Sequence, residues 1–129
     1  MNKELLDNYQ QMLKNYREMI DNYTKRRDKI LHVLFAEYLN EELKLSEHKD
    51  ELNLVNNKTD EYTFPFALAT KIHQWIYDNK FELTCFNYNG VVFEINDFFH
   101  CATVIIRFEN KDIFDEFQKT WKIDIASLI

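Results

Sequence analysis

The chain has 129 residues, of which 46% are hydrophobic and 16% aromatic, and its net charge is −6. This length and apolar content argue against global disorder and indicate one compact domain with an appended helix. The negative charge disfavours direct binding to nucleic acid, which needs a basic surface that displaces counterions. The one basic cluster comprises Lys25, Arg26, Arg27 and Lys29, and its role stays open at the level of sequence.

Residues 1–45 lack glycine and proline and are expected to form a helical region. The dipeptide Asn-Tyr recurs there at intervals of seven, and it belongs to a longer apolar pattern with alternating steps of four and three: Leu5, Tyr9, Met12, Tyr16, Met19 and Tyr23. Three further apolar residues, Leu6, Leu13 and Ile20, repeat at the same interval. On a helix these residues form one stripe, as in a coiled coil.

The sequence favours one long helix over a helical hairpin that turns near residues 22–24. One helix over residues 3–45 would be about 63 Å long at 1.5 Å per residue, which exceeds what a small domain covers. Because an uncovered stripe is too apolar for water, we expect self-association through its six core residues. The simplest assembly is a two-fold homodimer.

Residues 37–61 carry eight acidic and three basic residues. The candidate partner-binding residues in this segment are Glu37, Glu41, Glu42, Glu47, Asp50 and Glu51. Such a run is most often a solvated face. The alternative is an acidic surface that docks on a host protein, for example in the basic channel of a nucleic-acid-binding enzyme.

Residues 46–129 are expected to form an α+β domain with an antiparallel sheet of three to four strands and two packed helices. A polar excursion over 46–62 precedes a helix that begins near Pro65 and ends near residue 79. The stretch 81–95 predicts a hairpin with a type I′ turn at Asn89-Gly90, because that turn needs positive φ at both residues. A strand over 103–108 and a helix over 111–121 follow, and the tail either adds a strand or docks on the sheet.

Few residues of this chain are candidates for catalysis or for binding a phosphate or a metal ion. A phosphate-binding loop needs several glycines, and Gly90 is the one glycine present. Six potential metal ligands are scattered without zinc-site spacing: His32, His48, His73, His100, Cys85 and Cys101. We therefore expect no metal, no cofactor and no catalytic residue. A thiol-dependent hydrolase, with Cys85 or Cys101 beside a histidine, is the least favoured reading.

No stretch has the length and apolarity of a membrane span or the pattern of a signal peptide, and two cysteines make no disulfide framework. A cytoplasmic protein without a membrane partner is expected.

The segment VIIRFENKDIFDEFQKTW resembles a strand-then-helix element of small accessory proteins of tailed phages. The matching positions are Phe108, Glu109, Phe114, Phe117 and Trp121. Residues with AT-rich codons, namely Phe, Tyr, Met, Ile, Asn and Lys, make up 57 of the 129 residues, which indicates the AT-rich genome of a low-GC bacterium, a mobile element or a phage. Together with the resemblance, this composition favours a phage-borne gene whose product acts in the host cytoplasm. The expected function is therefore a non-enzymatic binding protein, such as an inhibitor of a host nuclease or defence system of the anti-CRISPR or anti-restriction type. The alternative is a structural homo-oligomer.

Overall fold

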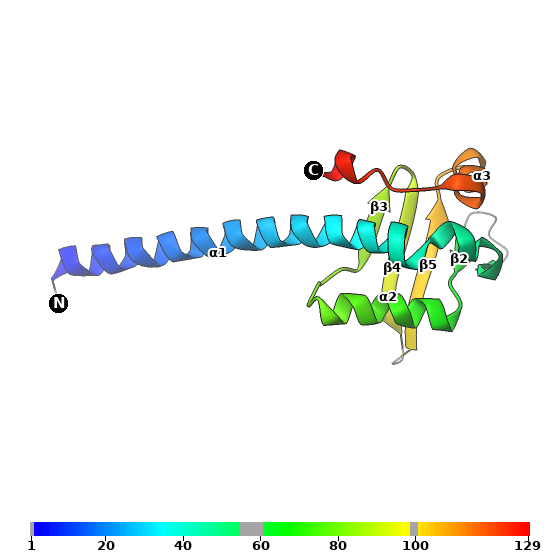
Figure 1. The fold of residues 1–129 in the computed structure, drawn as a ribbon. Coiled ribbons are helices and arrows are strands. Elements are labelled where there is room, and N and C mark those ends of the chain that lie inside the picture. The colour runs from blue at the N-terminus through cyan, green and yellow to red at the C-terminus, as the bar shows by residue number, and fades with distance from the viewer. Residues whose placement is uncertain (1, 55–60, 99–100) are drawn as a thin grey trace.

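A computed structural model describes residues 2–54, 61–98 and 101–129 of the chain. Helix α1 (Lys3–Glu37) is one uninterrupted helix, capped by the Asn2 side chain, which accepts a hydrogen bond from the backbone N–H of Glu4. It continues as the π-helical turn η1 (Tyr38–Leu43). Lys44 then takes up a left-handed conformation and leads into the 3₁₀ helix η2 (Leu45–Glu51). Of the two expected arrangements, the long helix is therefore the observed one, and the helical hairpin is not formed (Figure 1).

The sheet is antiparallel and has five strands in the order β1-β2-β5-β4-β3. Its strands are β1 (Asn53–Leu54), β2 (Glu61–Thr63), β3 (Cys85–Tyr88), β4 (Val91–Phe98) and β5 (Cys101–Phe108). The expected α+β class is confirmed. The count exceeds the expected three to four because two very short strands extend the sheet beyond β5, where β2 pairs with β5 and β1 pairs with β2. The hairpin strands extend to residue 98, beyond the expected limit of 95, and β5 begins at 101 where 103 was expected.

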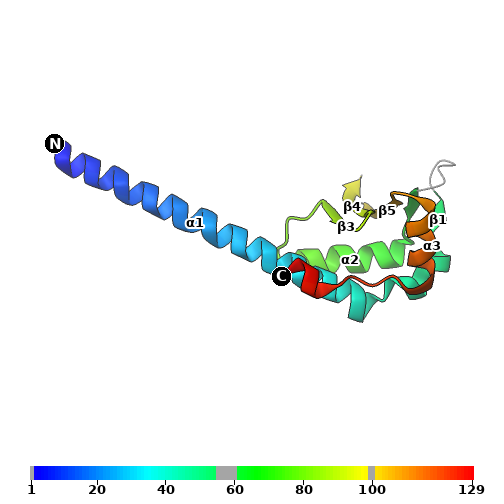
Figure 2. The ribbon, with the colours of Figure 1, turned by 90° about the horizontal axis from the view of Figure 1, so that it is seen from above.

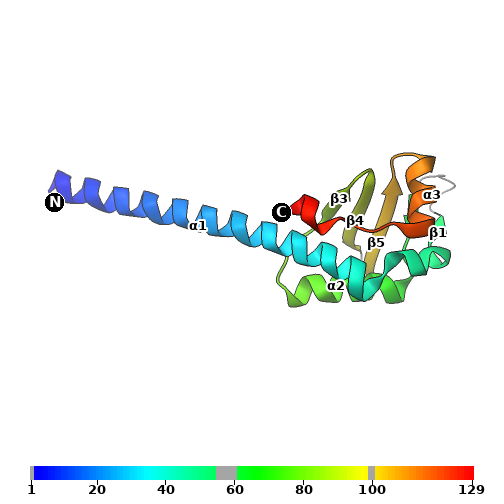
Figure 3. The ribbon, with the colours of Figure 1, turned by 45° about the horizontal axis from the view of Figure 1, so that its top comes forward.

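Three further helical segments follow in the described residues, and the sequence predicts the first two of them. They are α2 (Phe66–Asp78), α3 (Lys111–Thr120) and the short 3₁₀ helix η3 (Ile125–Leu128). Helix α2 and the domain end of α1 lie on the same side of the sheet (Figures 2 and 3). The opposite sheet face carries polar groups, including the ion pair between Arg107 and Glu94. The domain is thus two layers, with its core between the sheet and these helices.

The core includes residues from both sides of the expected division at residue 45. Leu31, Phe35 and Leu39 of the helical region are buried together with Phe86 and Phe93 of the sheet. The expected domain boundary at residue 45 would therefore cut through a single hydrophobic core. The part of α1 that projects from the domain ends near residue 26, one residue before the side chains begin to contact the domain.

The hairpin has the register that the sequence predicts. Phe86 pairs with Phe93 and Tyr88 with Val91, and Asn89 and Gly90 both have positive φ, at 44° and 80°. The Gly90 carbonyl also accepts a hydrogen bond of 2.8 Å from the Glu109 N–H, so the turn lies against the start of α3.

Gly90→Val is expected to destabilise the domain by roughly 1–3 kcal/mol, the cost of a β-branched residue at positive φ, because the groups that its Cβ would meet are the ends of flexible side chains that can move aside. A Cβ at this position would collide with Cδ1 of Ile113 and lie 2.8 Å from Oε2 of Glu109. Thermal unfolding followed by circular dichroism measures the loss. The control is Asn89→Gly, which keeps positive φ accessible and should leave the melting temperature nearly unchanged. An unaltered melting temperature in Gly90→Val would contradict the turn geometry.

Candidate self-association surface and acidic recess

The first 25 described residues of the chain form a stem that stands clear of the domain. Every residue from 2 to 26, hereafter the stem, is exposed to solvent. At 1.5 Å per residue the stem is about 37 Å long. It projects from one end of the domain, with the N-terminus at its tip (Figure 1).

The stem exposes its apolar side chains to water. Nine of them, hereafter the stripe, have exposed fractions between 45% and 69%: Leu5, Leu6, Tyr9, Met12, Leu13, Tyr16, Met19, Ile20 and Tyr23. The six residues expected to mediate self-association are all among them. A helix of this length is marginal in water on propensity alone, because helices gain most of their stability by packing an apolar face. The stripe therefore needs a cover.

Charge is absent from the stripe's side of the stem. The charged residues between its ends are Asp7, Lys14, Arg17, Glu18 and Asp21. At 100° per residue the stripe spans an arc of about 140°, and all five charges fall outside it. A second apolar helix could therefore approach the stripe without burying or repelling a charge.

The domain does not provide that cover, because α1 presents a different side to it. Within the domain α1 buries Leu31, Phe35 and Ala36, whereas Ile30 and Leu34, which continue the line of the stripe, remain 58% and 41% exposed. A line of exposed apolar residues thus continues beyond the stripe along the outer side of α1.

Arg27 marks the point where the stem joins the domain. Its guanidinium donates hydrogen bonds to the carbonyl oxygens of Asn79 (3.4 Å) and Lys80 (2.6 Å), at the C-terminal end of α2. A cation is favourable there because of the helix dipole. One member of the basic cluster, whose role the sequence left open, therefore has a structural role.

The stripe is large enough for a stable interface. Taking roughly 200 Å² as the full area of side chains of this size, its nine half-exposed members offer on the order of 1,000 Å² per copy. A standard protein interface uses about 800 Å² per partner.

The six acidic candidate residues are all exposed, but bases lie among them. Lys122 forms an ion pair of 3.4 Å with Glu41, and Nδ1 of His48 lies 3.3 Å from Glu51. Lys49, on η2, instead donates to the carbonyl oxygen of Gln118. Folding thus divides the run into one group on α1 and η1 and a second, Glu47, Asp50 and Glu51, on η2.

The first group surrounds a recess of about 390 Å³, hereafter the acidic recess. It is lined by Leu34, Glu37, Tyr38, Glu41, Glu42, Trp75 and Asn79. The rings of Tyr38 and Trp75 stack at 5.3 Å and 21°. Burial, and secondarily the negative charge of Glu42, raise the pKa of Tyr38 above its usual 10.0. Three carboxylates beside two aromatic rings favour a cationic side chain over an anion.

Glu42→Gln is expected to lower the pKa of Tyr38 while leaving it above 10, because burial is the larger cause. The folded state holds its phenol proton more tightly, so Tyr38 stabilises the fold below about pH 10. That contribution is lost as the pH rises through the raised pKa. NMR titration of labelled tyrosines, with Tyr38→Phe for assignment, measures the shift. Glu41→Gln is the control, and an equal shift in both variants would contradict a specific effect of Glu42.

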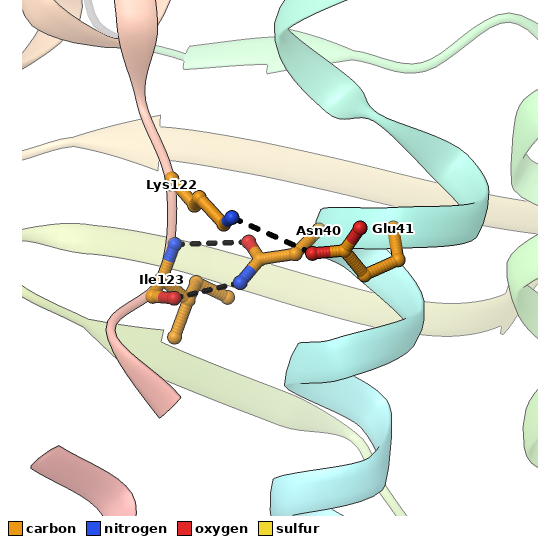
Figure 4. A network of polar contacts seen from close by, with 4 residues as sticks. All are labelled: Asn40, Glu41, Lys122 and Ile123. Carbon is orange, nitrogen blue, oxygen red and sulfur yellow. Dashed lines mark hydrogen bonds and ion pairs between the residues drawn. The ribbon is translucent and has the colours of Figure 1, made fainter. Parts of the chain in front are cut away.

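One polar contact secures the tail against η1. Asn40 donates from Nδ2 to the Ile123 carbonyl oxygen (2.6 Å), and its Oδ1 accepts from the Ile123 N–H (2.9 Å). Figure 4 shows these two hydrogen bonds beside the ion pair of Lys122 and Glu41. The tail therefore docks beside α1 and does not add a strand. No local sequence pattern indicates this role for Asn40, since the contact joins residues 83 positions apart.

Among the residues that the structure describes, no hydrogen bond joins either thiol to a histidine. Cys85 is exposed and donates to Oδ1 of Asn87 (3.2 Å), and Cys101 is also exposed. His73 bonds through Nε2 to the carbonyl oxygen of Thr103, and His32 through Nδ1 to that of Asp28. Of the histidines considered as thiol partners, His100 lies outside the described residues.

Within residues 2–54, 61–98 and 101–129, no three His, Cys, Asp or Glu side chains converge on a point suited to a metal ion. The helices in those ranges include none that combines the length and apolarity needed to span a bilayer. No protein-family model, curated protein or solved structure matches the chain.

Proposed function

We propose that the protein is a non-enzymatic binding protein that works as a homodimer, with the stem as its dimerisation element. The observation that carries this proposal is the stripe, nine apolar side chains at least 45% exposed on the stem, which no described part of the domain covers. A second copy is the fitting cover, because its own stripe has the same seven-residue period and the same freedom from charge. A strict seven-residue repeat makes two such helices supercoil about each other.

The test is the mass of the wild-type protein in solution. Light scattering coupled to size exclusion, at tens of micromolar, is expected to give twice the 15.8 kDa of one chain. Dilution should shift the average mass towards one chain, since dimerisation follows mass action. A mass of 15.8 kDa at all concentrations would overturn the proposal.

A second candidate function concerns the acidic recess. Glu37, Glu41 and Glu42 around stacked Tyr38 and Trp75 favour a partner that inserts an arginine or lysine. With the phage-like composition, this supports the expected inhibitor of a host nuclease or defence system, acting on a basic nucleic-acid-binding surface. The phage origin and the inhibitory role rest on the sequence.

An arginine-rich peptide, followed by fluorescence anisotropy, tests the acidic recess. Reversal of Glu37, Glu41 and Glu42 to Lys should abolish binding, and rising salt should weaken the wild-type interaction. Three exposed glutamates elsewhere, Glu18, Glu82 and Glu116, provide a control of equal charge change. Equal loss of binding in both variants would mean that net charge alone attracts the peptide, and the recess would then have no specific role.

A further inference from the structure

We propose that the two stems pair antiparallel, with residue 14 of each copy at the two-fold axis. This inference rests on the homodimer proposed above and adds its orientation and register. In heptad terms, Tyr9, Tyr16 and Tyr23 occupy position a, and Leu5, Met12 and Met19 occupy position d. Position g precedes each tyrosine and position e follows each d residue.

The central layers favour the antiparallel orientation. In a parallel pair each a residue meets its own copy, so three layers would place two tyrosine rings together and two would place Met on Met. In the antiparallel pair each a residue meets a d residue. Centred on residue 14, Tyr9 meets Met19, Tyr16 meets Met12 and Tyr23 meets Leu5. Every layer then combines one ring with one flexible or branched aliphatic side chain, which equalises the layer volumes. Four of the six layers also gain a sulfur–aromatic contact.

The flanks of the seam favour the same orientation more strongly. Every e position is aliphatic, namely Leu6, Leu13 and Ile20, and every g position is asparagine, namely Asn8, Asn15 and Asn22. In a parallel pair g faces e of the other helix, so each asparagine would lie against leucine or isoleucine. In an antiparallel pair e faces e and g faces g. Leu13 then meets its own copy and Leu6 meets Ile20.

Asparagine also complements itself on the other flank, because its side chain both donates and accepts hydrogen bonds. Asn15 meets its own copy, and Asn8 meets Asn22. One edge of the seam is therefore wholly aliphatic and the other is an asparagine ladder open to water. This sorting explains why Asn precedes Tyr in every repeat.

The register follows from the length of the stripe. Centring on residue 14 pairs each stripe residue with apolar or asparagine positions of the other copy. A shift of the register by one heptad towards the domains would bring Arg26 opposite Tyr9 and place a charge in the seam, and a shift in the other direction would leave Tyr23 without an opposing residue. In the centred register the attachment points of the two domains, at Arg27, lie about 39 Å apart along the axis. The assembly is thus an elongated dumbbell with a domain at each end.

Spin labels and pulsed dipolar EPR test this arrangement in the full chain. Single cysteines replace Lys3, Lys14 and Lys25, which all lie on the outer side of the stem, in a background of Cys85→Ser and Cys101→Ser. In the centred antiparallel pair, labels at residue 3, and equally at residue 25, are about 33 Å apart along the axis. Labels at residue 14 have no axial offset and give the shortest distance.

Each alternative has its own signature. Short distances at all three positions would establish a parallel dimer, which overturns this inference and leaves the homodimer intact. Unequal distances at residues 3 and 25 would overturn the register. An absence of dipolar coupling at every position would overturn both the orientation and the homodimer on which it rests. A light-scattering mass of the unlabelled Cys85→Ser and Cys101→Ser protein confirms that the background itself assembles as the wild type does.

Discussion

Changing Tyr9, Tyr16 and Tyr23 together to Glu is expected to convert the proposed dimer into a monomer of 15.8 kDa with a folded domain. The change places three charges in the seam, where each would be desolvated opposite an apolar side chain. Without a partner the stem loses the packing that sustains it, and about 20 residues of helix should melt. Light scattering measures the mass and circular dichroism at 222 nm the helix content.

The matched control alters net charge by the same three units on the polar side of the stem. Gln11→Glu, Lys14→Gln and Lys25→Gln together should leave both mass and helix content as in the wild type. Amide signals of the hairpin, recorded by NMR, report that the domain is intact in both variants. A triple tyrosine variant that retains the wild-type mass would show that the stripe is not the interface.

Phe35→Ala is expected to destabilise the domain by about 3–5 kcal/mol, the usual cost of deleting a fully buried phenylalanine ring. Phe35 is completely inaccessible to solvent, and its ring lies 5.4 Å from that of Trp75 and 5.2 Å from that of Phe86. It therefore joins α1 to both α2 and the sheet. Since the free energy of unfolding of a small domain is about 5–15 kcal/mol in total, this one change removes a large share of the stability.

Urea unfolding followed by tryptophan fluorescence measures the loss, because Trp75 reports the contact directly. Phe66→Ala is a control with the same change of residue type. Phe66 is 70% exposed at the start of α2, so its removal should cost no more than about 0.5 kcal/mol. Both variants are compared at one protein concentration, because the proposed dimerisation would contribute to apparent stability. A cost below about 1 kcal/mol in Phe35→Ala would contradict the anchoring role of the ring.

Local periodicity accounts for the elements that could be predicted from the sequence. The stripe, the hairpin register and the turn at Gly90 each depend on residues that are close in sequence, so each can be recognised from the sequence before the fold is known. The inward positions of α3 are of the same kind: Phe117 is buried and Ile113 and Phe114 pack against the core.

The contacts that the sequence could not reveal join distant segments. Arg27 donates hydrogen bonds to carbonyl oxygens 52 and 53 residues away, and Asn40 forms two hydrogen bonds with the backbone of Ile123, which lies 83 residues away. Strand β2 pairs with β5, although its three residues have no strand-like pattern of their own. For the candidate sites, the composition indicated an acidic run, but only folding assembles Glu37, Glu41 and Glu42 beside Trp75. The exposure of the stripe likewise depends on which side of α1 the domain covers.

The strand order has a consequence for how the protein is made. Strand β5 lies in the middle of the sheet, between β2 and β4, yet both neighbours precede it in the chain. During translation the sheet therefore cannot close until residues 101–108 have left the ribosome, because its central strand is missing until then. The stem emerges long before that point. Nascent chains on one message would thus expose their tyrosines while the domains are still open, so the proposed dimer would be able to form between neighbouring ribosomes before either domain has folded.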